Sequence, residues 1–113
     1  MELNGLHMKV LKSVMQSGDA PKPLNHIRSE AEGYLKANTP ATSMQAFEGR
    51  DARTERIDGH VAALVKAGHL ASADLGHSTA SVNPHYQVTP SGKQAFLDHI
   101  KADPENAIRL GEG

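Results

Sequence analysis

Residues 53–70, RTERIDGHVAALVKAGHL, form the pattern on which the predicted fold depends. The large apolar residues recur at the spacing of one helix face: Ile57, Val61, Leu64 and Val65. Asp51 can cap the start of this helix, and Gly68 favours its end because glycine accepts a left-handed backbone. Leu70 then opens a strand. The stretch therefore predicts an amphipathic helix over 52–67 with a β-strand directly after it.

Two helices are predicted before this stretch. Residues 3–15 place apolar side chains at helical spacing, and this helix is expected to end at Gly18. The second is expected to start near Asn25 as its N-cap and to end near Asn38. Its inward residues would be Ile27, Ala31, Tyr34 and Leu35.

Two short segments connect these helices. Pro23-Leu24 could form a one-bridge strand between the first helix and the second. Residues 40–48 are predicted to form a short extra helix or helical turn, which lengthens the connection to the third main helix. Whether this insert widens an interface or fills the core is left open.

A β-hairpin and a last helix are predicted after the central stretch. Residues 69–75 and 86–88 read as its two strands, joined by a polar tip over 76–84. Thr89-Pro90 provides an N-cap and a first helical residue for the last helix. The apolar face of that helix is expected to contain Ala95, Phe96, Leu97 and Ile100.

In this order the chain resembles the winged helix-turn-helix regulators, and among them the MarR-like and PadR-like repressors. Two stretches carry the resemblance: HVAALVKAGHL (60–70) and YQVTPSGKQAFLDHI (86–100). It implies a mainly α fold with a small β-hairpin wing (α+β), as one domain over 1–102 and a tail over 103–113. It also implies a transcription regulator that binds duplex DNA as a dimer, with the 52–67 helix in the major groove.

Composition bounds the remaining classes. The 113 residues suit one domain, and with 38% hydrophobic and 4% aromatic residues the core is thin, which favours a homodimer. There is no cysteine, so disulfides and thiolate metal sites are excluded. No apolar run approaches the roughly 20 residues that span a bilayer. The start of the chain lacks the features of a secretory signal, so we expect a cytoplasmic protein with no membrane partner.

The candidate DNA-binding residues lie on and around the third helix. Arg53, Arg56 and His60 share one flank, where Arg56 could meet a guanine edge and Arg53 a phosphate. The full set is Arg50, Arg53, Thr54, Arg56, His60 and Lys93. The alternative is an ordinary solvated face on which Glu55 and Asp58 pair with the arginines.

A winged-helix module that binds protein and not DNA is the second hypothesis. The formal net charge is −1, and residues 76–88 contain no Lys, Arg, Asp or Glu with which a wing could reach phosphates. Gly59, Ala62 and Ala63 give the third helix a surface of small residues that could serve as a protein interface. This hypothesis predicts a small accessory or inhibitor protein of the kind that mobile elements carry.

The sequence contains no recognisable catalytic or metal-binding motif. The seven histidines include His69, His77 and His85 around the hairpin, but no pair has the i, i+4 spacing with a Glu that marks zinc hydrolases. No nucleophile motif, phosphate-binding glycine loop or spaced carboxylate pair is present. We therefore expect neither an enzyme nor a metal or cofactor site.

Overall fold

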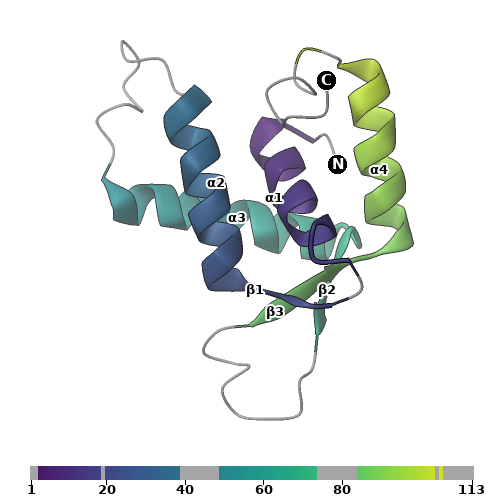
Figure 1. Ribbon diagram of the computed structural model, residues 1–113, viewed down its shortest axis with the longest axis horizontal. Coiled ribbons are helices and arrows are strands. Elements are labelled where there is room, and N and C mark those ends of the chain that lie inside the picture. Colours follow the sequence, from purple (N-terminus) through teal and green to yellow (C-terminus); the bar gives the residue numbers. More distant parts are fainter. Residues whose placement is uncertain (1–2, 19, 39–48, 74–83, 104, 106–113) are drawn as a thin grey trace.

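The structure, a computed structural model, describes residues 3–18, 20–38, 49–73, 84–103 and 105. Four helices and three short strands follow one another in these residues (Figure 1). They are α1 (Gly5–Met15), β1 (Lys22–Pro23), α2 (Leu24–Asn38), α3 (Arg50–Lys66), β2 (Leu70–Ala73), β3 (His85–Val88) and α4 (Pro90–Ala102). The sheet is antiparallel with the strand order β1-β3-β2. The expected mainly helical fold with a small β-sheet is confirmed at this level.

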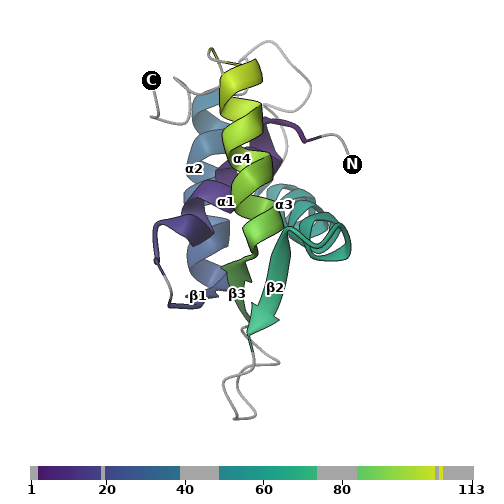
Figure 2. The same ribbon diagram turned by 90° about the vertical axis from the view of Figure 1, so that its right-hand side faces the viewer.

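Helix α1 is the centre of the core. It contacts α2, α3, α4 and β3, and it lies between α2 and α4 in Figure 1 and behind α4 in Figure 2. Its buried apolar side chains are Leu6, Met8, Val10, Leu11 and Val14. Most residues of α1 are buried, so this helix is covered on several sides by the other elements.

Helix α3 packs against α1 and α2. It buries one stripe, as predicted: Ile57, Val61 and Leu64. Val65 was expected in the same stripe but is 37% exposed. At ~100° per residue it lies a quarter-turn from Leu64, at the edge of the buried face. Gly68 ends α3 as predicted: its φ is 83°, and the His69 N–H donates to the Leu64 carbonyl at 2.9 Å.

The predicted N-caps of two helices were wrong. Helix α3 begins at Arg50 after Gly49, so Asp51 is not its cap but an acidic residue in its first turn, where it favours the helix dipole. Helix α2 begins at Leu24 directly after β1, which places Asn25 inside the helix. The first helix also ends earlier than predicted, at Met15, and Gly18 (φ 63°) closes the turn that follows.

Parts of the sequence predictions lie outside the described residues. These are the helical segment over 40–48, residues 74 and 75 of the first hairpin strand, all of the hairpin tip except Pro84, and most of the tail over 103–113. The predicted returning strand is confirmed as β3. Its Val88 pairs with Leu70 of β2.

The start of α4 fixes that helix to the turn after α3. Thr89 is the N-cap as predicted: its Oγ1 accepts from the Gly92 N–H at 3.0 Å and donates to the Gly68 carbonyl at 2.6 Å. Gly92 is buried, and a Cβ on it would lie 2.1 Å from the His69 carbonyl oxygen. The close packing of α4 on this turn therefore requires glycine at position 92.

A buried polar cluster attaches β1 to α1 and α2. Lys22 is buried, and its Nζ donates to the Ser13 carbonyl at 2.9 Å and to Glu30 Oε1 at 2.6 Å. The Ser13 hydroxyl donates to the other oxygen of Glu30. Burial alone would raise the pKa of Glu30, but the hydrogen bonds from Lys22 and Ser13 offset it, so the pKa is lowered. The carboxylate therefore stays ionised opposite the buried ammonium.

A second polar cluster joins the start of α1 to α3. Asn4 caps α1 with a capping box, in which its backbone N–H donates to His7 Nδ1 at 3.0 Å. His60 Nδ1 lies 2.7 Å from the Arg56 carbonyl and must donate to it, which leaves Nε2 to accept from Asn4 Nδ2 at 3.0 Å. The rings of His7 and His60 are 4.4 Å apart. Burial and, secondarily, His60 lower the pKa of His7 to about 4.

We expect Gly92→Ala to destabilise the fold by at least ~2 kcal/mol, because the new methyl group meets backbone atoms that cannot rotate away. Urea unfolding measures the effect. Gly33→Ala is the matched control: a Cβ there has no heavy atom within 4 Å, and in a helix it should add about 0.5–1 kcal/mol. Equal stability of the two variants would contradict the packing at the start of α4.

His7 should make the fold sensitive to mild acid. Because its pKa falls from 6.5 to about 4 on folding, the folded chain binds fewer protons between these values. The contribution of neutral His7 to the free energy of unfolding is fully present above pH 6.5 and is lost as the pH falls toward 4. The free energy of unfolding should fall by about 2–3 kcal/mol over this range, at ~1.4 kcal/mol per pKa unit. Unfolding free energies at pH 7 and 4.5 measure it.

The control is His7→Gln, which keeps an acceptor for the capping box but does not titrate. The loss of stability between pH 7 and pH 4.5 should be smaller in this variant by the His7 contribution. The same loss in both chains would mean that His7 is not held neutral by the fold.

Candidate functional site

Arg53, a predicted phosphate contact, points toward α2. Its Nε and Nη2 donate to Glu32 Oε1 at 3.2 and 2.9 Å, and its side chain is only 19% exposed. The hydrogen bond from Arg53 lowers the pKa of Glu32, so this carboxylate remains charged. Within the chain, Arg53 therefore connects the first turn of α3 to α2.

A second arginine–carboxylate pair joins the same two helices. Arg28 on α2 donates from Nε to Asp58 Oδ1 at 2.8 Å and from Nη2 to Oδ2 at 2.6 Å. This bidentate geometry fixes both side chains, and the hydrogen bond to Asp58 raises the pKa of Arg28. The two pairs together fix the position of α3 on α2.

His60, also a predicted DNA contact, faces α1. Its ring contacts His7, and both ring nitrogens have partners in Arg56 and Asn4. The predicted basic flank of Arg53, Arg56 and His60 is thus divided by the structure, since two of its three members face neighbouring helices. Arg56, which is half-buried, is the third.

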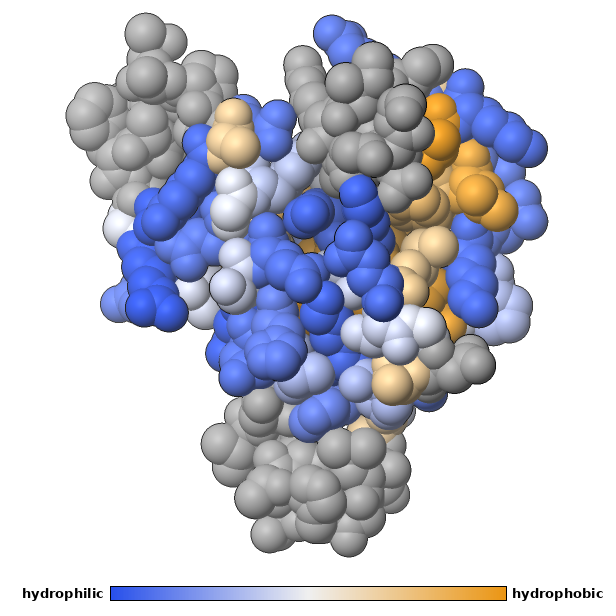
Figure 3. Space-filling model, viewed as in Figure 1, coloured by the Kyte–Doolittle hydropathy of each residue, from blue (hydrophilic) through white to orange (hydrophobic). Residues whose placement is uncertain are grey.

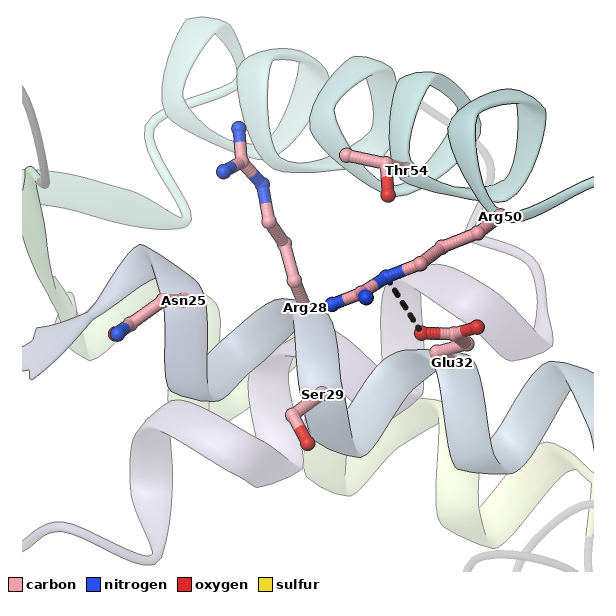
Figure 4. A pocket seen from close by; sticks show the side chains of 6 residues that line it. All are labelled: Asn25, Arg28, Ser29, Glu32, Arg50 and Thr54. Atoms are coloured by element: carbon pink, nitrogen blue, oxygen red, sulfur yellow. Dashed lines mark ion pairs between the residues drawn. The ribbon is translucent and has the colours of Figure 1, made fainter.

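A polar hollow of about 320 Å³ lies between α2 and α3 (Figure 4). Its lining contains two predicted residues, Arg50 and Thr54, one helical turn apart on α3. Arg50 is 82% exposed, and its Nε lies 4.0 Å from Glu32 Oε2. The α2 wall consists of Asn25, Arg28, Ser29 and Glu32.

The four residues of the α2 wall were not predicted as site residues. They follow one another at the i, i+3, i+4, i+7 spacing of a single helix face, so the sequence did contain a signal for a polar face on α2. What the sequence could not show is that this face lies opposite Arg50 and Thr54. That depends on how α2 packs on α3.

Lys93 lies far from the hollow. It is exposed in the first turn of α4, which packs on the turn that follows α3. Arg50 and Lys93 therefore mark opposite ends of α3 and do not form one cluster. A single ligand could meet both only if it followed the length of the helix.

The outer face of α3 contains the predicted protein-interface residues. Gly59 and Ala62 are exposed and Ala63 is half-buried, and a Cβ added at Gly59 would meet no heavy atom within 4 Å. Glu55 and Lys66 are the exposed charged residues beside them. The structure thus shows an open, small-residue surface of nearly balanced charge.

The charges on α2 and α3 nearly balance. The two helices contain six Lys and Arg residues and five Asp and Glu residues. The hollow between them is lined by two arginines, Arg28 and Arg50, and by one carboxylate, Glu32. The excess of cations is therefore local to the hollow.

Other chemistry has little support in the described residues. They contain no group of three His, Asp or Glu side chains arranged to hold a metal ion, and none of their helices is long and apolar enough to cross a membrane. The hollow with its two arginines is the site whose geometry suggests a ligand. No protein-family model, curated protein or solved structure matches the chain, so the site is interpreted from its geometry and charge alone.

Proposed function

We propose that the chain is a winged helix-turn-helix protein that binds duplex DNA through α3 and acts as a transcription regulator. The observation that carries this proposal is the placement of α3. It buries only its inner stripe, and its first turns extend past α2 (Figure 1). The order of the elements and the sheet order β1-β3-β2 also suit a winged helix, in which the third helix enters the major groove.

The charge distribution supports the same proposal. DNA affinity depends on cations that meet phosphates, and two arginines against one carboxylate line the hollow between α2 and α3. Arg50 and Lys93, at the two ends of α3, would meet the backbone. Arg56, between them, would reach a base edge in the groove. In this proposal Arg53 and His60 position α3 and do not touch DNA.

A homodimer is part of the proposal. An apolar groove between α1 and α4 is lined by Lys12, Met15, Gln16, Phe96 and Leu97. Leu97 was expected on the buried face of α4 but is 50% exposed. Figure 3 shows apolar side chains gathered over α4 and between α4 and α1. Pairing through this face would cover Leu97 and leave α3 of each copy open to DNA.

Three single variants test the DNA assignment. Duplexes selected from a random pool are compared with scrambled duplexes by fluorescence anisotropy at several salt concentrations. Arg56→Ala should reduce the preference for the selected duplex by about tenfold, because it loses a base contact. Lys93→Ala should weaken both duplexes and lower the log–log salt slope by ~0.9, because it loses one phosphate contact.

Lys101→Ala is the control, since Lys101 is an exposed cation in the last turn of α4, away from α3. It should change neither the preference nor the slope. The absence of any anisotropy change at low salt, or equal effects of all three variants, would rule out the proposed use of α3.

Protein binding through the outer face of α3 is the second candidate, and the open surface at Gly59 and Ala62 favours it. Ala62→Arg separates the two candidates. An added cation should preserve or strengthen DNA binding, whereas it should abolish a close contact with a partner protein. Measuring DNA affinity and co-purification for this one variant tells which occurs.

A further inference from the structure

We propose that the hollow between α2 and α3 binds a phosphate-type oxyanion through Arg50, Arg28 and Thr54, and that Glu32 competes with the anion for Arg50. The chemical class follows from the hollow itself. The assignment of its source, a backbone phosphate of DNA, rests on the proposed function.

The donors converge from both walls. The Arg50 side chain extends across the hollow toward α2, Arg28 rises toward α3, and the Thr54 hydroxyl faces the space between the helices (Figure 4). Arg28 uses Nε and Nη2 for Asp58, but a guanidinium has five N–H groups, so donors remain for a ligand. Two guanidinium groups and a hydroxyl suit the oxygens of a phosphate.

The charges favour an anion. Two arginines, Arg28 and Arg50, line the hollow against one carboxylate, Glu32. Arg50 is the one held most loosely. Its Nε is 4.0 Å from Glu32, beyond hydrogen-bonding distance, so it can turn to a ligand without breaking a hydrogen bond to that residue.

Glu32 occupies the position of a competitor. It lies in the hollow wall and is bound by Arg53 at 2.9 Å and by Lys36 at 3.6 Å, with Arg50 on its other oxygen. Its lowered pKa means that its negative charge persists at neutral pH. A phosphate near Arg50 would therefore be repelled by Glu32, and removal of this charge should strengthen binding.

The volume sets the size of the ligand. At about 320 Å³ the hollow is at the small end of ligand sites, so it suits one phosphate with part of its attached sugar and not a whole buried cofactor. It also opens beside the projecting first turn of α3, where a DNA strand along the groove edge would pass in the proposed function. Glu32 would then limit the affinity for DNA in general.

The test uses opposite variants of the two charged residues. Inorganic phosphate is titrated into the full chain at constant ionic strength. The NMR shifts of the backbone amides of Arg50 and Thr54 and of the Arg50 Nε are followed. The affinity for duplex DNA is measured in parallel by anisotropy. Glu32→Gln should raise the affinity for both ligands about two- to fivefold, and Arg50→Gln should lower both by a similar factor. Arg50→Gln should also reduce the DNA salt slope by ~0.9.

Lys101→Gln controls for overall charge, and the far-UV circular dichroism of each variant controls for folding. If Glu32→Gln raises and Arg50→Gln lowers the affinity for both phosphate and DNA, the anion site and its assignment to a DNA backbone phosphate are supported. A response to phosphate with no DNA binding would support the hollow and reject the proposed function.

DNA binding that is indifferent to Glu32→Gln and Arg50→Gln, with no phosphate shifts at Arg50 or Thr54, would reject the hollow and leave the proposed function standing. If neither phosphate nor DNA binds, both the anion site and the proposed function are rejected. Reduced affinity in Glu32→Gln would show that Glu32 supports the site and would overturn its role as a competitor.

Discussion

The buried Lys22 ammonium constrains the rest of the structure. A charge taken out of water must be matched by hydrogen bonds and an opposite charge, and Lys22 finds both in the Ser13 carbonyl and Glu30. These partners belong to α1 and α2, so β1 has one position relative to both helices. Because β1 pairs with β3 and β3 with β2, which follows α3, the same contact fixes the sheet against the core. The pair is weak evidence for high stability, since an apolar replacement of equal volume can be as stable.

The features of the fold that could be predicted were those set by residue spacing and helix capping within a few residues. The stripe of Ile57, Val61 and Leu64 and the Thr89-Pro90 start of α4 follow from spacing and capping chemistry, which act within a few residues. The N-caps of α2 and α3 did not follow. Helix α2 continues straight from a strand whose position is set by the buried Lys22, and nothing in the sequence around Asn25 indicates that contact. A lysine is also among the residues that sequence reasoning places on the surface.

The candidate site was predicted less well than the fold because periodicity gives a helix its faces but not its neighbours. Arg53 and His60 lie on the flank where the sequence placed them, yet that flank meets Glu32 on one side and His7 on the other. Their partners are 21 and 53 residues away along the chain, so no local rule could pair them. Arg50 and Thr54, two of the predicted candidates, line the hollow, and its opposite wall on α2 was available only as an unassigned polar face.

Internal ion pairs determine which arginines of α2 and α3 are already held by a carboxylate. Glu32 and Asp58 convert Arg53 and Arg28 from mobile surface charges into fixed contacts between α2 and α3. A partly exposed pair of this kind adds little stability, but it orients the guanidinium groups. The carboxylate that orients a guanidinium group would repel an anion beside it, but the oriented donors would need no further ordering on binding. A chain with almost no net charge can therefore still hold a local excess of cations, as the two arginines and one carboxylate of the hollow show.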